Sequence, residues 1–462
     1  MPSRPKIQSI NPATEELLAE FEPHTEAEVE RALGEARRAF RSWRSSSFAE
    51  RSTLMRAAAV DLRREKARLA GIVTAEMGKP IVEAEAEVEK CAWGLEYYAE
   101  NAERFLAPEP RASTARESYV QFTPLGTVLA VMPWNFPLWQ VFRFAAPALM
   151  AGNTAVLKHA SNVPQCARAV EEVFRAAGFP EGTFRTLLVG GSAVASIIAD
   201  PRVAAVTLTG SEAAGGDVAA RAGAACKKTV LELGGSDPFI VLEDADLAAA
   251  AATAVRARYQ NTGQSCIAAK RFVVVERVFE EFQASFLEGV RALRVGDPRD
   301  RQTLIGPMAR DDLRGALEDQ VRRSLAQGAR VLAGGQRRAG RGYFFEPTVV
   351  TGVRPDMAVA SEEVFGPVAA LLPVRDALEA VRVANASPYG LGSSLWTSDL
   401  ERARRLAAEI ESGQVFINGM VASDPRLPFG GVKRSGYGRE LSEFGIREFV
   451  NIQTVWIGPA RS

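Results

Sequence analysis

Residues 203–233 read VAAVTLTGSEAAGGDVAARAGAACKKTVLEL, a strand pattern, a helix pattern and a second strand pattern in turn. The outer segments, 203–209 and 229–233, are short, apolar and rich in β-branched residues. The middle segment, 212–224, is rich in alanine. Two short apolar runs joined by a helix are typical of a β-α-β unit, whose strands lie parallel. The stretch therefore predicts part of a parallel sheet.

The same alternation extends toward the N-terminus. Further strand patterns occupy 126–132, 154–157 and 186–189, and helix patterns stand between them at 141–150, 163–177 and 193–199. Five strands that alternate with helices predict an α/β fold with a doubly wound parallel sheet. Such a sheet binds ligands beyond the carboxyl ends of its strands, beside helix N-termini.

A second α/β region follows residue 235. Its strand patterns are centred near Phe239, Phe272, Val331, Val349, Val368, Ser394 and Val415, and its helix patterns near Ala250, Phe282, Leu317, Ala380 and Arg404.

Helical patterns dominate the N-terminal region. Thr25 and Glu28 have the capping-box spacing at the start of a helix over 25–43. Two long amphipathic helices are predicted over 49–77 and 80–105. We expect packing and a solvated face from them, and no chemistry.

Two strand patterns lie outside both predicted sheets. The pattern at 449–457 follows a glycine-rich segment near the C-terminus. We expect it to pair with another subunit, and the alternating segment 117–122 around Tyr119 is a candidate to join it.

The composition excludes several function classes. The chain of 462 residues has room for two or three domains, and its zero formal net charge argues against nucleic acid or an anionic membrane as a partner. No apolar run is long enough for a membrane helix, and the start lacks the apolar core of a signal peptide. Four cysteines without a CxxC pair predict reduced thiols in the cytoplasm, with no disulfide framework and no metal site.

Only two histidines, His24 and His159, are present. This scarcity argues against a Ser-His-Asp triad, a histidine-rich metal site or a histidine proton shuttle. Any general base is therefore expected to be a carboxylate, a lysine or a cysteine.

Cys266 ends the segment NTGQSC, residues 261–266, between a helix pattern and a strand pattern. A lone cysteine is more often buried and structural than reactive. However, Glu232 stands before a Gly-Gly turn, and Asn135 stands in the segment PWNFP at 133–137. A thiol, a carboxylate and an amide can act as nucleophile, base and oxyanion donor at a carbonyl carbon.

Other motifs are weaker when taken alone. Gly210 and Ser211 join a strand to a helix and can face a phosphate, although a simple turn with an N-cap is the commoner outcome. The chain has no G-x-G-x-x-G fingerprint. Lys158 ends a predicted strand of the same sheet. The glycine-rich segments 428–433 and 435–440 form either tight connections or loops that line a pocket.

Five segments together resemble the aldehyde dehydrogenase superfamily, in that family's order. They are residues 133–137, 232–235, 261–266, 363–367 and 428–433.

The resemblance implies an aldehyde dehydrogenase-like fold with three parts. Residues 1–106 and 125–232 would form the cofactor-binding domain, and 233–433 the catalytic domain. Strands in 107–124 and 446–462 would form a small β oligomerisation element, joined through 434–446. A homodimer or homotetramer is expected.

The resemblance also implies a mechanism. Cys266 attacks an aldehyde to give a thiohemiacetal, whose oxyanion is held by the Asn135 amide and the Cys266 backbone N–H. Hydride passes to NAD or NADP, and Glu232 then activates the water that hydrolyses the thioester. The residues implied in cofactor binding are Trp134, Lys158, Ser161, Gly210, Ser211, Glu363 and Phe365.

A finer resemblance is to the bacterial succinate-semialdehyde dehydrogenase branch, carried by residues 157–164 and 424–440. It implies that Arg143 clamps the distal carboxylate of the substrate, with Ser423 near it. Many relatives have a second arginine where this chain has Gln260, so a weaker clamp and a wider substrate range are expected.

Two further positions depart from the common pattern of the family. Many NAD-selective members have a glutamate where this chain has Ser161, so NADP is not excluded by charge. Ala268 replaces a cysteine that permits a redox switch in some relatives, so no such switch is expected.

The function predicted from the sequence is therefore the NAD(P)-dependent oxidation of succinate semialdehyde to succinate. The alternatives are a dehydrogenase for glutarate semialdehyde or for a broader range of aliphatic aldehydes, a CoA-acylating enzyme, and a non-catalytic protein on the same scaffold. Glu232 argues against the acylating enzyme, because a thiol acceptor would need no activated water.

Overall fold

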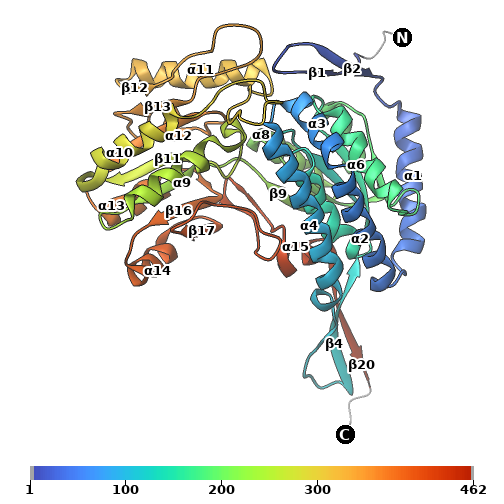
Figure 1. Ribbon diagram of the computed structural model, residues 1–462. Coiled ribbons are helices and arrows are strands. Elements are labelled where there is room, and N and C mark those ends of the chain that lie inside the picture. The colour runs from blue at the N-terminus through green and yellow to red at the C-terminus, as the bar shows by residue number, and fades with distance from the viewer. Residues whose placement is uncertain (1–4, 459–462) are drawn as a thin grey trace.

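The computed structural model describes residues 5–458 (Figure 1). A hairpin of β1 (Ile7–Ile10) and β2 (Leu17–Phe21) precedes α1 (Glu26–Trp43). Thr25 and Glu28 form the predicted capping box at the start of α1, so that prediction is confirmed.

The predicted single helix over 49–77 is wrong, because the structure has α2 (Phe48–Arg64) and α3 (Lys66–Met77). The backbone leaves the helical region at Glu65, which ends one helix and starts the next. Each helix buries its own apolar side chains in the same core, so the break is fixed by packing and not by a glycine or proline. The next helix, α4 (Ile81–Phe105), begins after Pro80, close to its predicted start.

The first large sheet has the strand order β19-β9-β8-β5-β6-β7. Five strands run parallel, and β19 pairs antiparallel with β9 at the edge. The bounds are β5 (Thr127–Met132), β6 (Thr154–His159), β7 (Phe184–Thr186), β8 (Val203–Thr209), β9 (Lys228–Glu232) and β19 (Gly436–Tyr437). The helices between them are α5 (Trp139–Met150), α6 (Pro164–Ala176), α7 (Val194–Ala199) and α8 (Glu212–Ala224).

The predicted doubly wound parallel sheet is thus confirmed, with one strand displaced. The prediction of a strand over 186–189 is wrong, because β7 covers Phe184–Thr186. Its position is set by pairing with β6, where Phe184 lies opposite Ala155. Such pairing is not visible in the local sequence.

The second large sheet has the order β12-β13-β14-β11-β10-β16-β17, and all seven predicted strands are present. Only β12 runs antiparallel to its neighbour. The strands are β10 (Asp237–Val241), β11 (Ala269–Val275), β12 (Arg330–Ala333), β13 (Thr348–Thr351), β14 (Val368–Val374), β16 (Gly392–Trp396) and β17 (Gln414–Ile417). The helices are α9 (Leu247–Tyr259), α10 (Glu276–Arg291), α11 (Asp311–Ala326), α12 (Ala358–Ser361), α13 (Ala377–Asn385) and α14 (Leu400–Glu409).

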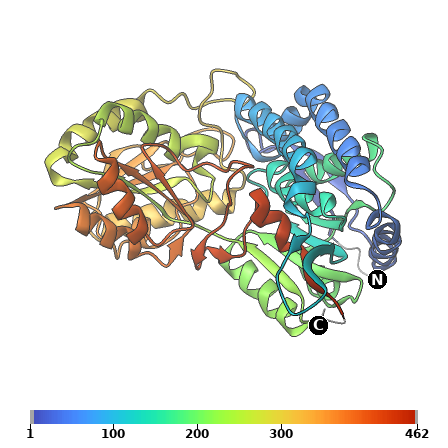
Figure 2. The same cartoon turned by 90° about the horizontal axis from the view of Figure 1, so that it is seen from below.

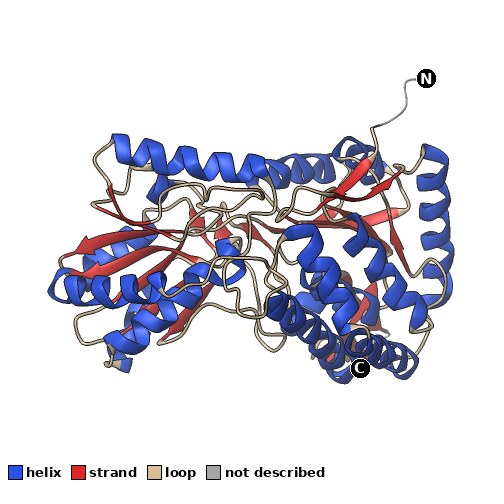
Figure 3. Cartoon of the chain, turned by 45° about the horizontal axis from the view of Figure 1, so that its top comes forward, coloured by secondary structure: helices blue, strands red, loops and turns tan. Residues whose placement is uncertain are grey.

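Helices cover the faces of both large sheets (Figure 3). Separate apolar clusters lie on the two sides of each sheet, which explains why the strands are apolar throughout instead of alternating. The sheets form two lobes, seen from below in Figure 2. The predicted domain boundary after residue 232 stays a prediction, although β9 and β10 belong to different sheets.

A small third sheet projects from the lobe of the first sheet (Figure 1). It consists of β3 (Glu109–Pro110), β4 (Glu117–Pro124) and β20 (Val450–Ile457), and α15 (Ser442–Glu448) precedes β20. Val455 pairs with Tyr119, so the predicted partner segment is found within the same chain. The remaining two short strands, β15 (Tyr389–Gly390) and β18 (Val432–Lys433), pair with each other. Within residues 5–458, no helix combines the length and apolar character needed to cross a membrane.

Candidate functional site

The loop that carries Cys266 starts in an unusual backbone conformation. Asn261 and Thr262 both have φ of 55°. This left-handed region is uncommon for a threonine, so surrounding contacts must hold it. The Asn261 N–H donates to Glu83 Oε2 at 2.7 Å, and Thr262 Oγ1 accepts from the Gly306 N–H at 3.0 Å. The loop is therefore fixed to α4 on one side and to the second lobe on the other.

A buried lysine holds the other end of the loop. Lys270 Nζ donates to the carbonyl oxygens of Ser265, Cys266 and Ala268 at 2.8–3.1 Å. Burial raises the pKa of the Cys266 thiol to about 12, although Arg143 and Lys270 act against this rise. The thiol is thus protonated at neutral pH, and its reaction must include loss of that proton.

The segment 133–137 lies against this loop. Asn135 Nδ2 donates to the carbonyl oxygen of Gln264 at 3.1 Å, and Asn261 Nδ2 donates to the carbonyl oxygen of Asn135 at 2.8 Å. One hydrogen of the Asn135 amide therefore remains for a ligand. The predicted oxyanion donor, Asn135, therefore binds the loop at Gln264, two residues before the predicted nucleophile Cys266.

His159 binds the last residue of the same segment, Pro137. Its Nδ1 accepts from the Ala160 N–H at 2.8 Å, so Nε2 carries the hydrogen and donates to the Pro137 carbonyl at 2.8 Å. Burial lowers the pKa of His159 to about 4, which keeps the ring neutral. This histidine has a structural role, as the scarcity of histidines suggests.

Glu232 ends β9 and is buried. Neither of its carboxylate oxygens has a hydrogen-bond partner among residues 5–458. Burial raises its pKa well above the ordinary value, and the neighbouring Glu440 raises it further. A carboxyl group with a raised pKa and free oxygens is suited to accept a proton near neutral pH.

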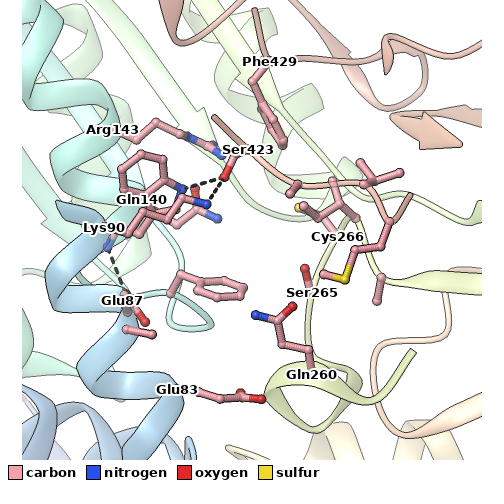
Figure 4. Close-up of a pocket in the computed structure, with 18 of the residues that line it drawn as sticks. Glu83, Glu87, Lys90, Gln140, Arg143, Gln260, Ser265, Cys266, Ser423 and Phe429 are labelled. Atoms are coloured by element: carbon pink, nitrogen blue, oxygen red, sulfur yellow. Dashed lines mark hydrogen bonds between the residues drawn. The ribbon is translucent and has the colours of Figure 1, made fainter. Parts of the chain in front are cut away.

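A cavity of about 290 Å³ opens beside Cys266 (Figure 4). Arg143, Gln260 and Ser423, the three predicted substrate-binding residues, all line it together with Cys266. Phe429, from the glycine-rich segment 428–433, also lines it, so that segment does contribute to a pocket.

Arg143 lies in the buried wall of this cavity and is already paired. It forms an ion pair with Glu440, and its guanidinium lies 4.6 Å from the ring centre of Phe429. Its Nη2 also donates to Thr209 Oγ1 at 3.4 Å. The carboxylate partner at Glu440 was not predicted, because it follows the glycine-rich segment far along the chain.

One face of α4 lines the cavity, although only packing and a solvated face were expected from the helix over 80–105. The expectation of no chemistry from this helix stays a prediction. Glu83, Glu87 and Lys90 all line the cavity. Their spacing of three to four residues places them on one side of the helix. Charged residues at this spacing usually face water, so the sequence offers no signal that separates this face from a solvated one.

The predicted cofactor residues lie at the carboxyl end of the first sheet. Trp134 follows β5, Lys158 is near the end of β6, and Gly210 and Ser211 follow β8. Ser211 Oγ caps α8 by accepting from the Ala214 N–H at 3.3 Å. Such a helix N-terminus attracts phosphate groups.

Two more predicted cofactor residues come from the second lobe. Glu363 Oε1 accepts from the Gly235 N–H at 2.9 Å, and the Phe365 ring meets the Trp134 ring edge-on at 5.6 Å. Residues 133–137 and 363–367 therefore meet between the lobes, where a nicotinamide would lie beside Cys266.

The residues present fit an NADP molecule at this crevice. Lys158 forms no ion pair with any residue in 5–458, and burial lowers its pKa. Ser161 is exposed and carries no charge that would repel a phosphate. An unpaired lysine, a neutral hydroxyl and a helix N-terminus at the carboxyl end of one sheet suit a phosphorylated ribose.

Comparisons with known proteins agree with this geometry. The sequence model described as the aldehyde dehydrogenase family matches residues 1–455. A Mycobacterium tuberculosis protein named succinate-semialdehyde dehydrogenase (NADP+) 1 is 54% identical over 454 residues, 98% of this chain and 99% of that protein. A Synechocystis protein named probable succinate-semialdehyde dehydrogenase (NADP+) is 52% identical, with 98% and 99% covered. The solved Streptococcus pyogenes succinic semialdehyde dehydrogenase in complex with NADP+ superposes with a TM-score of 0.96 at 39% identity, covering 98% of this chain and 100% of that chain.

Proposed function

Because the chain belongs to the aldehyde dehydrogenase family, we propose that it oxidises succinate semialdehyde to succinate with NADP+. The observation that carries the proposal is the single cavity shared by Cys266 and Arg143. A thiol on one side can attack an aldehyde while a cation on the other binds a carboxylate. The named relatives support the same substrate and cofactor.

The chemistry starts at Cys266. Its sulfur bonds to the aldehyde carbon as the thiol releases its proton to solvent, and the carbonyl oxygen becomes an oxyanion. The amide of Asn135, held beside the loop, and the Cys266 N–H donate to this oxygen. Removal of one such donor typically costs about 10²–10³ in rate. A bound NADP+ supplies the acceptor for the hydride that leaves this carbon.

Glu232 acts in the second half of the reaction. The loss of hydride leaves a thioester on Cys266. The free carboxylate oxygens of Glu232 accept a proton from water as that water attacks the thioester carbon. Succinate leaves, and the thiol takes up a proton. The raised pKa of Glu232 makes it a stronger base than an exposed carboxylate.

We also propose that the protein is a homodimer or homotetramer. One edge of β20 is not paired with any strand described in residues 5–458. Ile452 is 62% and Trp456 55% exposed on this strand. An exposed strand edge with large apolar side chains is suited to pair with a second chain.

Initial rates test the proposed reaction. Succinate semialdehyde and butanal have the same chain length, and only the first has a carboxylate. We expect kcat/KM to favour the semialdehyde, and NADP+ to exceed NAD+ as acceptor. Equal rates for the two aldehydes would contradict the proposed substrate. A preference for glutarate semialdehyde would move the assignment to the longer homologue.

A further inference from the structure

We propose that Lys90 is a second cation for the substrate carboxylate and restores the positive charge that Gln260 lacks. The inference rests on the proposed function and concerns a residue that the sequence pattern does not single out. Lys90 lies on α4 and lines the cavity together with Arg143, Ser423 and Cys266 (Figure 4).

Contacts fix the Lys90 side chain at the cavity wall. Lys90 Nζ donates to Ser423 Oγ at 2.7 Å and lies 4.7 Å from the ring centre of Trp139. Trp139 Nε1 donates to the same Ser423 Oγ at 3.1 Å. The ammonium group is therefore held in one place and not extended into solvent.

These contacts leave Ser423 with only a donor to offer. A hydroxyl has one hydrogen and two acceptor sites. Lys90 and Trp139 occupy both acceptor sites, and no residue in 5–458 accepts the Ser423 hydrogen. Ser423 and Lys90 thus both present donors at the same wall of the cavity, which is the requirement for binding an anion.

The charges around Lys90 leave it without a carboxylate counter-ion among residues 5–458. The charged or titratable groups that face it are Arg143 on α5, Glu87 and Cys91 on α4, and Asp424 in the following loop. Glu83 also lines the cavity; it accepts from the Asn261 N–H, and burial raises its pKa to about 7. The other nearby carboxylates are paired with cations. Glu87 pairs with Lys79 and Asp424 pairs with Arg426, while Glu440 pairs with Arg143.

Lys90 itself forms no ion pair within residues 5–458. Burial, together with the charge of Arg143, lowers its pKa to about 8. A buried, unpaired ammonium group is unfavourable until an anion reaches it. A carboxylate that enters the cavity would supply the missing negative charge.

Substitution of Lys90 tests the assignment. Lys90→Met keeps most of the side-chain volume and removes the charge, and Lys90→Arg keeps the charge. We expect Lys90→Met to raise KM for succinate semialdehyde about 10- to 100-fold, the range for loss of a hydrogen bond to a charged group. KM for butanal should stay within about twofold, and Lys90→Arg should recover most of the loss. Lys66→Met removes a lysine that does not line the cavity and should behave as the unmodified enzyme.

The pH dependence gives a second readout that needs no variant. Because the pKa of Lys90 is lowered to about 8, the side chain loses its proton and its charge as the pH rises above that value. The ratio of kcat/KM for succinate semialdehyde to that for butanal should therefore fall as pH rises through about 8. Cys266 and Glu232 act on both substrates and cancel in this ratio. Glu83 lines the same cavity, and burial raises its pKa to about 7, so a decline that its charge causes would occur in Lys90→Arg as well. The decline centred near pH 8 should be absent from Lys90→Arg.

The outcomes separate the two proposals. If the unmodified enzyme does not prefer the semialdehyde, the proposed function is wrong and the Lys90 assignment is wrong with it. If the preference exists but survives in Lys90→Met, only the Lys90 assignment is wrong. An equal rise of KM for both aldehydes would give Lys90 a purely structural role and overturn the assignment. If Lys90→Met does not fold, the pH dependence of the unmodified enzyme decides. A ratio of kcat/KM for the two aldehydes that stays constant through pH 8 would overturn the Lys90 assignment.

Discussion

At the scale of single residues, Cys266 and Glu232 are the two groups that transfer protons during the reaction, and they come from different lobes. Cys266 holds its proton until an aldehyde is present, because burial raises its pKa to about 12. Glu232 lies at the end of a strand of the other lobe, with both oxygens unpaired in the described chain. The bond to the substrate therefore forms with loss of the thiol proton, and Glu232 acts afterwards on the water that hydrolyses the thioester.

Cys266→Ala tests the covalent step. Turnover should fall by more than about 10⁴-fold, because no sulfur can bond to the aldehyde carbon. Dinucleotide affinity should persist, since the residues around the first sheet are unchanged. The measurements are NADPH formation and fluorescence titration with NADPH. Oxidation at an undiminished rate would contradict the role of Cys266.

Glu232→Gln tests the hydrolytic step. The amide cannot accept a proton, so we expect a burst of about one NADPH per active site followed by slow turnover. In the unmodified enzyme, kcat should fall as pH decreases through the raised pKa of Glu232, because the protonated carboxyl is no longer a base. That acidic limb should be absent in Glu232→Gln. Steady turnover without a burst would contradict the assignment.

At the scale of elements, α4 supports the site by binding the start of α5. Glu87 Oε1 accepts from the N–H groups of Leu138 and Trp139, both at 2.9 Å, and the carboxylate also pairs with Lys79. Carboxylates at a helix N-terminus stabilise it through its unpaired N–H groups. The segment with Asn135 immediately precedes this helix, so Glu87 helps to fix the oxyanion donor.

Glu87→Ala should lower stability strongly. The change leaves Lys79 as a buried unpaired charge and frees two helix N–H groups, for which a cost of about 3–5 kcal/mol is typical. The unfolding midpoint in urea measures the effect. Glu89→Ala is the control on the same helix, because Glu89 pairs with Arg63 at the surface, where about 0–1 kcal/mol is expected. Equal midpoints for the two variants would rule out this role of Glu87.

Local signals in the sequence predict most of these elements. Thr25 and Glu28 mark the start of α1, and the seven strands of the second sheet follow from apolar runs. The break at Glu65 depends on packing, and the placement of β7 depends on its pairing with β6. No residue type in the local sequence predicts either feature. Local pattern therefore predicts which elements exist better than where they end.

The candidate site also contains residues that the sequence predicts and one that it does not. Arg143, Gln260 and Ser423 were expected from resemblance, and the structure brings them into one cavity with Cys266. Lys90 could not be predicted, because its partner Ser423 is 333 residues away in the chain. A contact of that kind exists only once α4 has packed against the loop from the second lobe.

At the scale of the whole molecule, the arm of β3, β4 and β20 projects from the lobe of the first sheet (Figure 1). We propose that a second chain covers the strand edge on which Ile452 and Trp456 are exposed. The residues that line the cavity come from α4, the segment leading into α5, α5 itself and the second lobe, and none belongs to the three strands of the arm.

The double substitution Ile452→Asp and Trp456→Asp should disrupt assembly, because two buried charges at an interface are unfavourable. Sedimentation velocity should show a shift toward the monomer at low micromolar concentration. Leu378→Asp is the control, since Leu378 is 70% exposed on α13 and lies outside the arm. If both variants sediment alike, the arm is not the contact between subunits.

The protonated state of Cys266 also bears on survival between catalytic cycles. Peroxide reacts with thiolates and converts them to sulfenic acid and then to irreversible products. A sulfur that releases its proton only on meeting an aldehyde presents little thiolate to such oxidants. With Ala268 two residues after it, Cys266 has no neighbouring cysteine that could trap a sulfenic acid as a repairable disulfide, so the protonation of its own sulfur governs how readily peroxide attacks it.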